Sequence, residues 1–336
     1  MNETLGPPRT EPAADGHPGT PHPTEVRKNG APRPAGTTED TGPAARRPPR
    51  GRGKRAPLSL SRVGVNAILL LVLVYTLAPP VWLLMASTKN LTDLFGTNGF
   101  APGHHFDLFS NLRHLFAAQD GIYLRWLGNT LLYAGGGAVL AALICAMAGY
   151  AFDKFDFPGK GATYGLVLVG VMIPTAALVL PTYLLAARVH LTNSFWGVFL
   201  PGLVFPFGVY LARIFSASYV PDEVVEAARM DGAGELRAFW SVALPMMRPG
   251  FVTIGLFQFT AIWNNFFLPL VMLSNQQLYP VNLGLYAWNA SALSQGHPDD
   301  YLLAITGSLV AVIPLIALFL AVQRFWRSGM TAGAVK

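Results

Sequence analysis

The sequence predicts an all-α membrane protein with six transmembrane helices and with both termini in the cytoplasm. Its 336 residues are 52% hydrophobic and only 12% charged, with a mean hydropathy of +0.38, which is too apolar for a soluble chain of this length. Six apolar segments reach or approach the roughly 20 helical residues that cross a bilayer. Lys and Arg are unevenly distributed among the connections between these segments, and this asymmetry orients them.

Residues 1–62 are predicted to form a disordered, basic, cytoplasmic tail. Pro, Gly, Arg, Thr and Ala dominate this stretch, and it contains no apolar period that could be buried. It carries eleven Lys and Arg against six acidic residues, so the tail supplies most of the positive charge of the chain. The run RRPPRGRGKR is compatible with nucleic-acid binding, but a topogenic stretch facing lipid is commoner before a first span. We expect membrane lipid as its partner, no nucleic acid, and no cleaved signal peptide.

Residues 63–336 are predicted to form one transmembrane domain. None of its six apolar segments contains Asp, Glu, Lys, Arg or His, the side chains that proton-coupled carriers and voltage sensors need at membrane depth. Pro201 and Pro206 interrupt the fourth and shortest segment, so a broken or tilted helix packed by protein is expected there. The predicted spans are 65–86, 128–151, 163–186, 196–212, 251–273 and 302–323.

The distribution of positive charge predicts the orientation of these spans. Twenty of the 24 Lys and Arg fall in the tail, in residues 152–162, in residues 213–250 and at the C-terminus. The excess persists, at nine against four, when the long tail is left out. By the positive-inside rule these segments lie in the cytoplasm, and residues 87–127 and 274–301 lie outside.

The polar connection 213–250 is predicted to contain a helix, a turn and a second helix. Pro221 suits the first turn of a helix, and the acidic residues that follow it, Glu226 among them, place negative charge near the positive end of the helix dipole. Gly232 in a left-handed conformation would end this helix after Asp231 at little cost.

The second helix of this connection is expected to begin at Glu235 and to continue to Val242. Pro245 and Pro249 follow, and each of them lacks the amide hydrogen that an interior helical position donates. We therefore expect the helix to end at these two prolines.

The sequence contains no motif that supports catalysis or metal binding. No GxxxxGK[ST] phosphate loop is present, because Gly159-Lys160-Gly161 lacks both the upstream glycine and the hydroxyl, and neither HExxH nor GxSxG occurs. The chain is not expected to be an enzyme. The single cysteine, Cys145, excludes an intrachain disulfide. His104 and His105 are metal-ligand types, but histidines in a loop without a neighbouring Cys or carboxylate are more often solvated, so no metal is expected.

The connection 213–250 also resembles a known family. Its residues Glu226-Ala227-Ala228, Asp231-Gly232-Ala233, Leu244-Pro245 and Pro249 resemble the EAA loop of bacterial binding-protein-dependent ABC importers, in which a coupling helix seats in a cleft of the ATPase subunit. The alternative reading is an ordinary solvated loop.

The resemblance extends from about Tyr75 to Lys336 and is to permeases of the carbohydrate-uptake group, MalG-like subunits in particular. Asn265 departs from the pattern, because an acidic residue is usual there, and no ion-pairing role is carried over to it. The matching segments are Asn129-Thr130, Ala148 to Phe152, Phe157 to Lys160, Met172-Ile173-Pro174, Pro181-Thr182-Tyr183, Trp263 to Phe266 with Pro269-Leu270, and Gln323 to Trp326 with Gly329 to Gly333.

This resemblance implies a division of labour in a bacterial cell membrane. An extracytoplasmic binding protein would deliver a sugar or oligosaccharide, this multi-pass subunit and a second permease would form the pathway, and an ATPase dimer that binds ATP-Mg would drive transport. ATP biases the pathway only if contacts at the loop differ between the inward and outward states. The expected contact residues are Glu226, Ala227, Ala228, Asp231, Gly232 and Ala233. The alanines also serve as plain helix formers, and Glu226 also stabilises a helix start.

Polar residues in and near the spans are candidates for the substrate pathway. Sugars are bound by hydroxyl and amide partners and by flat apolar rings, which Trp263, Asn264 and Asn265 provide in the fifth span. Asn129 and Gln258 are further candidates. Amides inside a span also hold helices together, so both roles remain open for these side chains.

Other classes of membrane protein remain as alternatives. A channel needs a polar stripe or a charged ring, and a secondary carrier needs an ion site or internal repeats; the six spans show neither clearly. Within the ABC class, an importer of another solute, such as a polyamine or phosphate, shares the EAA loop and differs in its binding protein. A scaffold without transport is a third alternative, which ATP-driven uptake would exclude.

Overall fold

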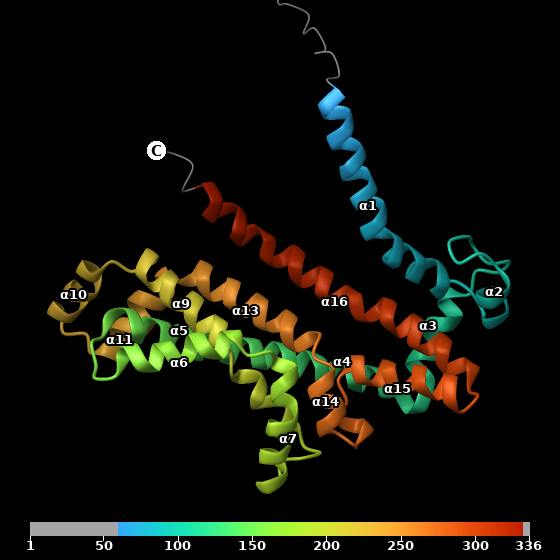
Figure 1. The fold of residues 1–336 in the computed structure, drawn as a ribbon. Coiled ribbons are helices and arrows are strands. Elements are labelled where there is room, and N and C mark those ends of the chain that lie inside the picture. Colours follow the sequence, from blue (N-terminus) through green and yellow to red (C-terminus); the bar gives the residue numbers. More distant parts are fainter. Residues whose placement is uncertain (1–59, 332–336) are drawn as a thin grey trace, which may run out of the picture. The chain divides into compact units, whose positions relative to one another are not determined.

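The computed structural model describes residues 60–331, with side chains from 64 to 323, and every regular element in that range is helical (Figure 1). The predicted tail lies outside the described residues up to residue 59, as do residues 332–336. Helix α1 (Leu60–Ser87) already begins before the domain boundary expected between residues 62 and 63.

Four helical runs in the described range are long and apolar enough to cross a membrane, and two bent pairs raise the number to six if each pair is one span. The first run is α1. The second joins α3 (Leu108–Ala117), η1 (Ala118–Gly121), α4 (Ile122–Leu131), η2 (Leu132–Gly136) and α5 (Gly137–Lys154). The third joins α8 (Phe195–Phe199), η4 (Pro201–Leu203) and α9 (Pro206–Tyr219), and the fourth is α16 (Pro298–Thr331). The break expected in the fourth segment at Pro201 and Pro206 is confirmed.

The segment predicted as the span 163–186 is sharply bent. Helix α6 (Lys160–Met172) ends just before Pro174, and η3 (Thr175–Leu178) with α7 (Val179–Arg188) continues at an angle of 102°. Ile173 has an extended backbone, with φ −79° and ψ 123°, the conformation that a following proline favours. The bend thus has a local cause at Pro174.

The segment predicted as the span 251–273 is discontinuous. Helix α13 (Arg248–Trp263) stops at Asn264, and a short helix, α14 (Phe267–Met272), follows it. The side-chain amide of Asn264 donates to the Thr260 carbonyl at 2.9 Å, a bond that competes with the helical pattern at this end. The predicted span 251–273 therefore contains a helix break that its apolar composition does not reveal.

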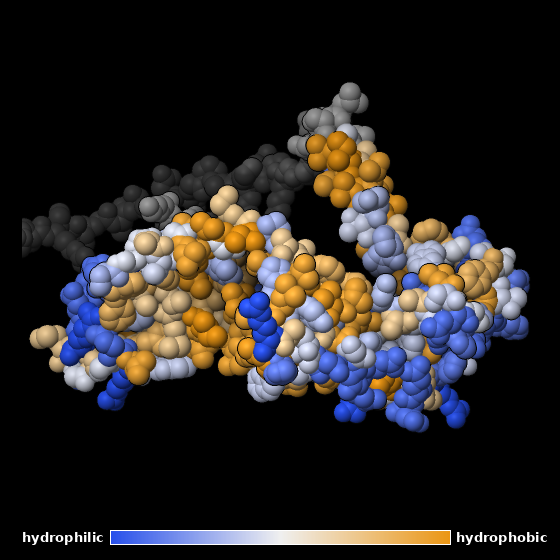
Figure 2. All heavy atoms as spheres, turned by 60° about the horizontal axis from the view of Figure 1, so that its bottom comes forward, coloured by the Kyte–Doolittle hydropathy of each residue, from blue (hydrophilic) through white to orange (hydrophobic). Residues whose placement is uncertain are grey.

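The connections predicted to lie outside contain helices of their own. Besides α3 and α4, they form α2 (Leu91–Gly96), η6 (Gln276–Leu278) and α15 (Val281–Ser294). Figure 2 shows hydrophilic residues gathered at the end that carries α10 and at the opposite end that carries α2 and α15, with mostly hydrophobic residues on the face between them. This distribution is the one expected of a molecule whose middle part, between the two hydrophilic ends, lies in lipid.

Small residues allow close packing of the helices beneath the polar connection 213–250. A Cβ atom on Gly149 of α5 would overlap the side chain of Ala212 and the backbone of Arg213 on α9. A Cβ on Gly208 would lie 2.7 Å from the sulfur of Cys145. Such contacts between small residues are the usual way in which membrane helices approach one another closely. They make α5 and α9 a closely packed pair next to the candidate site.

Candidate functional site

The polar connection between α9 and α13 folds as a hairpin of two short helical segments. Helix α10 (Asp222–Met230) has Pro221 at its N-cap, and the second segment comprises α11 (Glu235–Ala238), η5 (Phe239–Ala243) and α12 (Leu244–Met246). Figure 1 shows α10 and α11 at one end of the helices α5, α6 and α9. We call residues 221–246 the hairpin.

The geometry of the turn explains the spacing between Glu226-Ala227-Ala228 and Asp231-Gly232-Ala233. Gly232 has a φ of +81°, which confirms the left-handed conformation predicted for it. Its N–H donates to the Arg229 carbonyl, and the N–H of Ala233 donates to the Ala228 carbonyl, both at 3.0 Å. This pair of bonds is a Schellman motif, which satisfies the last carbonyls of α10. The turn therefore depends on backbone groups of Ala228, Gly232 and Ala233.

Ion pairs hold the two helices of the hairpin to each other and to α5. The Arg229 guanidinium donates from Nε to one oxygen of Glu235 at 2.9 Å and from a terminal nitrogen to the other at 3.1 Å. This bidentate contact raises the pKa of Arg229 above its ordinary value. At the other end, Lys154 Nζ lies 2.6 Å from an oxygen of Asp222 and holds the pKa of that carboxyl below its ordinary value.

Apolar residues anchor the hairpin to the helices below it. Val225 of α10 and Phe239 of the second segment are buried in one cluster with Tyr150 of α5 and Ile254 of α13. The rings of Tyr150 and Phe239 have centroids 5.4 Å apart. The hairpin is therefore packed directly on α5 and α13 through this buried cluster.

The second segment of the hairpin differs from its prediction. It does not end at Pro245, which lies inside α12, and Pro249 lies in the first turn of α13, where its missing amide hydrogen is harmless. The wider π turn η5 immediately precedes Leu244 and Pro245 and accommodates the missing bond. The chain bends by 81° between this segment and α13, at Met247.

All six predicted coupling residues lie on α10 or in the turn. Glu226, Ala227, Asp231 and Gly232 are exposed, whereas Ala228 and Ala233 are half-buried.

The prediction missed the large apolar side chains that the hairpin exposes. Met230 is 88% exposed, Leu236 is 69% exposed and Trp240 is 49% exposed. Their signal in the sequence is the placement of Met230 and Leu236 on either side of the Gly232 turn, within an otherwise charged segment. Exposed apolar side chains so close together, next to charged ones, are typical of an interaction surface.

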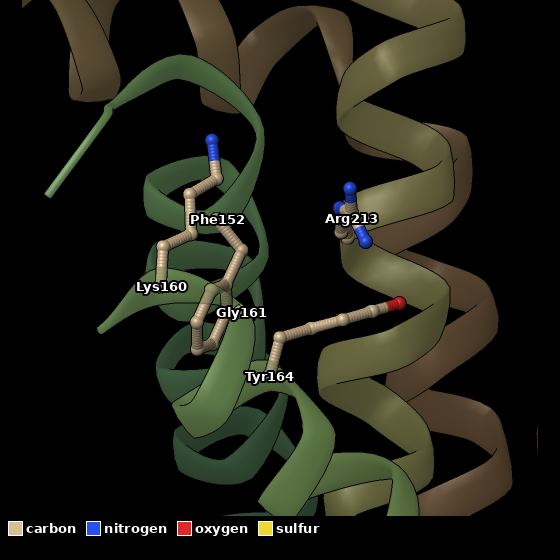
Figure 3. A pocket seen from close by; sticks show the side chains of 5 residues that line it. All are labelled: Phe152, Lys160, Gly161, Tyr164 and Arg213. Atoms are coloured by element: carbon tan, nitrogen blue, oxygen red, sulfur yellow. The ribbon is translucent and has the colours of Figure 1, made fainter. Parts of the chain in front are cut away.

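A small cavity of about 240 Å³ lies beside the hairpin, between α5, α6 and α9 (Figure 3). The Arg213 guanidinium lies over the ring of Tyr164, 4.2 Å from its centroid. Phe152, Lys160 and Gly161 complete the lining. Two cationic side chains, Lys160 and Arg213, thus line a cavity in the part of the chain predicted to face the cytoplasm.

The five predicted pathway residues do not gather at one cavity. Asn129 donates to the backbone carbonyls of Gln277 and Tyr279, at 2.8 and 3.0 Å, and Gln258 is buried and donates to the Gly202 carbonyl at 2.6 Å. These two amides hold neighbouring segments in place.

The other three pathway residues lie together at the break between α13 and α14. Trp263 is buried at the end of α13, with its ring stacked on Phe259, while Asn264 is exposed and Asn265 is half-buried. Breaks in a membrane helix free backbone groups for ligands and are tolerated where they line a cavity or are buried in protein.

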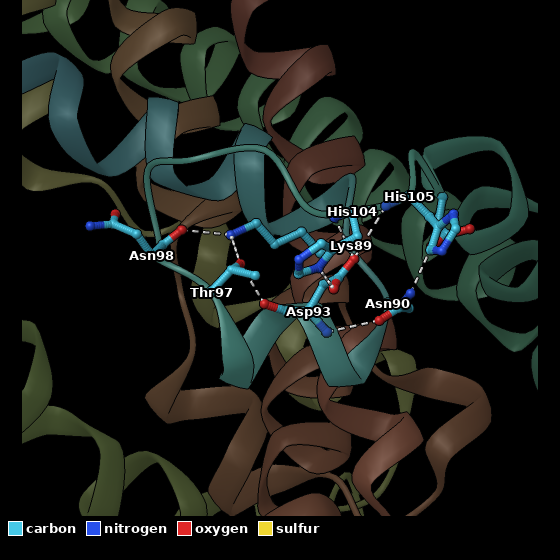
Figure 4. Close-up of polar contacts among 8 residues, drawn as sticks. Lys89, Asn90, Asp93, Thr97, Asn98, His104 and His105 are labelled. Carbon is cyan, nitrogen blue, oxygen red and sulfur yellow. Dashed lines mark hydrogen bonds and ion pairs between the residues drawn. The ribbon is translucent and has the colours of Figure 1, made fainter.

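At the end of the helix bundle opposite the hairpin, a network of polar contacts orders residues 89–107, which we call the clasp (Figure 1 and Figure 4). Asp93 accepts a hydrogen bond from Nδ1 of His104 at 2.6 Å and one from the backbone N–H of the same residue at 2.8 Å. The contact with the His104 side chain holds the pKa of Asp93 below its ordinary value. The expectation that His104 lacks a carboxylate partner is therefore wrong, because the fold brings Asp93 to it. The described residues contain no group of three or more His, Cys, Asp or Glu that could hold a metal.

Lys89 is the buried centre of the clasp. Its Nζ donates to Thr97 Oγ1 at 2.9 Å and to the Asn98 carbonyl at 2.7 Å, and no side-chain surface of Lys89 is exposed. Replacing Lys89 with methionine keeps the length of the stem and removes both bonds. We expect the free energy of unfolding to fall by about 1–3 kcal/mol, because both hydrogen bonds of the buried ammonium group are lost. Thermal unfolding in detergent measures this change.

The control for this variant is Lys160→Met. Lys160 makes a partly exposed ion pair with Asp156 at 3.0 Å, so its loss is expected to lower the free energy of unfolding by at most about 1 kcal/mol. Equal loss of stability in the two variants would contradict a structural role for the buried ammonium of Lys89.

The sequence of the chain matches a known family and several named transport proteins. Residues 138–330 match the family model described as binding-protein-dependent transport system inner membrane component. The chain is 31% identical to the arabinooligosaccharides transport system permease protein AraQ of Bacillus subtilis, over 83% of this chain and 97% of that protein. It is 29% identical to the diacetylchitobiose uptake system permease protein NgcG of Streptomyces coelicolor, over 81% and 88% of the two chains.

A solved structure shows the same fold. It is the crystal structure of a bacterial ABC transporter involved in the import of the acidic polysaccharide alginate, with a TM-score of 0.67 at 22% identity over 79% of this chain and 98% of that chain. The family match, the relatives and the apolar helices lead to one conclusion. The chain belongs to the binding-protein-dependent transport system inner membrane components and is a permease of an ABC transport system in the cell membrane.

Proposed function

We propose that this permease takes up a sugar or oligosaccharide together with a second permease, an ATPase dimer and an extracytoplasmic binding protein. The observation that carries the proposal is the hairpin, which exposes Met230 and Leu236 at its turn while Val225 and Phe239 anchor it in the bundle. An exposed apolar turn on a firmly held support is suited to seat in a cleft of another subunit. The names of the relatives, which refer to arabinooligosaccharides and diacetylchitobiose, support a carbohydrate as the solute.

The six predicted coupling residues have a specific part in this proposal. The half-buried Ala228 and Ala233 shape the turn, and Glu226 and Asp231 offer charge at its edge. Gly232 sets the angle between the two helices, because its left-handed conformation produces the reversal. ATP binding in the partner would act on the pathway through α5 and α13, which share the buried cluster of the hairpin.

We propose that the sugar passes the break at Asn264 and Asn265, close to Trp263. The break lies between α13 and α14; within residues 64–323 the backbone N–H of Asn265 donates to the Ile262 carbonyl at 3.1 Å, whereas its side-chain amide makes no hydrogen bond. A free amide beside an aromatic ring is suited to contact a sugar. Asn129 and Gln258 support the neighbouring segments of this pathway rather than the solute, since their amide hydrogens are bonded to backbone carbonyls.

The proposed orientation places the hairpin, both termini and the 1–62 tail in the cytoplasm. It predicts that Cys introduced for Met230 reacts with a membrane-impermeant maleimide only after the cells are opened, whereas Cys introduced for Leu293 reacts in intact cells. Both positions are highly exposed, at 88% and 77%, and the native Cys145 is buried at 1% exposure, so it contributes little background. Labelling of Met230→Cys in intact cells would reverse the orientation.

Reconstitution tests the proposed function as a whole. The chain, its partner permease, the ATPase and the binding protein are placed in liposomes, and uptake of labelled arabinotriose, diacetylchitobiose, lactose and maltotriose is measured with and without ATP. We expect ATP-dependent uptake of at least one of these sugars. Uptake of spermidine or phosphate in their place would show that the solute is not a carbohydrate, and passive flux without ATP would indicate a channel.

The same complex tests the docking role of the hairpin. A thiol crosslinker attached to Met230→Cys is expected to capture the ATPase subunit, and the same reagent at Leu293→Cys is not. Identical crosslinked products from Met230→Cys and Leu293→Cys would contradict docking of the turn on the ATPase.

A further inference from the structure

Residues 153–155, at the end of α5, contact both ends of helix α10 in the hairpin. Lys154 Nζ donates to a carboxylate oxygen of Asp222, the first residue of α10, at 2.6 Å. Near the other end of α10, the guanidinium of Arg229 lies over the ring of Phe155, 5.9 Å from its centroid. These two residues of α10 are about 10 Å apart along the helix axis. The end of α5 therefore supports most of the length of α10.

Apolar packing holds α10 chiefly at one point. Among residues 222–230, Val225 alone is buried, and Ala228 is half-buried. Asp222, Val225 and Arg229 follow one another at spacings of three and four residues, so the polar contacts lie on the same face of the helix as the buried side chain. One buried side chain fixes the position of a helix more firmly than its direction. The ion pair at Asp222 adds a second point of attachment and so fixes the direction as well.

The ammonium group of Lys154 is itself held in place by α5 and α9. The side chain of Lys154 is 7% exposed, and its Nζ also lies 3.0 Å from Oδ2 of Asp153. The same Oδ2 accepts a hydrogen bond from Ser216 Oγ of α9 at 2.7 Å, and Ser216 is buried. None of these groups belongs to the hairpin. A cation fixed by the helices below thus faces the start of α10.

The burial of Lys154 distinguishes this contact from an ordinary surface ion pair. Exposed ion pairs contribute little to stability, whereas a charge that is largely removed from water needs partners of opposite charge. Within residues 64–323, Asp153 and Asp222 are the two carboxylates that pair with Lys154. Displacement of the start of α10 would leave this buried cation with one of them. The network therefore favours the orientation of α10 described above.

We propose that Lys154 is a positioning residue of the permease, which holds α10 in the orientation that the ATPase binds. The inference rests on the proposed docking of the hairpin. Met230 lies at the end of α10 opposite Asp222, so a pivot of the helix about Val225 displaces the exposed turn. The apparent affinity for a partner falls in proportion to the fraction of molecules in the competent orientation. Loss of the ion pair is therefore expected to weaken docking although the docking surface itself is unchanged.

Direct contact between Asp222 and the ATPase is the competing explanation for an effect at this position. The side chain of Asp222 is 76% exposed, whereas that of Lys154 is 7% exposed and offers little surface to a partner. The two explanations differ in how substitutions combine. If Asp222 acts through Lys154, removing both side chains costs no more than removing one.

The test uses both permeases in nanodiscs and the purified, fluorescently labelled ATPase, whose dissociation constant is measured by titration. Lys154→Met and Asp222→Asn each remove one charge and nearly preserve the size of the side chain. We expect about fivefold weaker binding in each variant. The double variant is also expected to bind about fivefold more weakly, not roughly 25-fold as for two independent losses. Lys154→Arg keeps the charge, and its affinity is expected to stay within about twofold of the wild type.

The matched control is Lys160→Met. Lys160 forms an ion pair of its own with Asp156 at 3.0 Å, which does not involve the hairpin, so wild-type affinity is expected. Thermal unfolding of each purified chain identifies a folding defect. Wild-type affinity in either single variant, or losses that multiply in the double variant, overturns the positioning role while the proposed docking stands. Failure of the wild-type permeases to bind the ATPase overturns the docking as well.

Discussion

Replacing Gly149 with valine is expected to disrupt the packing of α5 against α9 and to lower the free energy of unfolding by about 3 kcal/mol or more. A Cβ at this position would overlap Ala212 and the backbone of Arg213, and a backbone cannot move aside as a flexible side chain can. The same two helices carry the hairpin, so we expect loss of partner binding as well as loss of stability. Thermal unfolding of the purified chain in detergent measures the first effect.

Gly165→Val is the matched control for this prediction. Gly165 also lies inside an apolar helix, α6, but nothing lies within 4 Å of the Cβ that a side chain would add. The change there is expected to alter the free energy of unfolding by about 1 kcal/mol at most. Gly149→Ala, with a single methyl group, is expected to fall between the two. Equal stability of the two valine variants would show that α5 and α9 do not approach as described.

Replacing Met230 with aspartate is expected to weaken association with the ATPase by about 30-fold, the effect of losing about 2 kcal/mol at a central apolar contact. Met230 is 88% exposed at the turn of the hairpin, so its replacement removes no internal contact of consequence. A charge at this position would have to be desolvated on docking, which adds to the loss. ATP-driven uptake should fall with association while the chain itself unfolds at the same temperature.

Leu293→Asp provides the control for the change at Met230. Leu293 is 77% exposed on α15, at the end of the molecule that is proposed to face away from the ATPase. Co-purification of the ATPase with this variant is expected to match the wild type. Unchanged ATPase binding in Met230→Asp would mean that the hairpin does not dock through its turn.

The elements that local chemistry determines could be predicted from the sequence. Runs of apolar residues located the helices, and the left-handed Gly232 located the turn, because each depends on neighbouring residues alone. The bend at Pro174 and the break at Asn264 were hidden within apolar composition, which indicates burial in lipid but not the direction of the chain.

Contacts between distant segments could not be predicted in this way. The pairing of Asp93 with His104 depends on how a short loop closes, and the contact between Trp126 and Trp288 forms only when residues 87–127 and 274–301 meet. The exposure of Met230 is likewise a property of the folded hairpin, since the sequence alone assigns an apolar residue to a buried face as readily as to a surface. The residues that form the hairpin could therefore be predicted from the sequence, whereas the exposure of its apolar side chains could not.

Helix α1 is attached to the rest of the bundle mainly at one end. Its most apolar window is 0% buried, whereas Ala86 and Ser87 at its end are buried next to Lys89 of the clasp. The Asn111 side chain ties this end further by donating to the Ser87 carbonyl at 2.9 Å. A helix held in this way can respond to a thicker or thinner bilayer by changing its tilt, at a small free-energy cost per ångström of mismatch. We therefore expect the tilt of α1 to follow the thickness of the bilayer more readily than the tilt of the helices packed within the bundle.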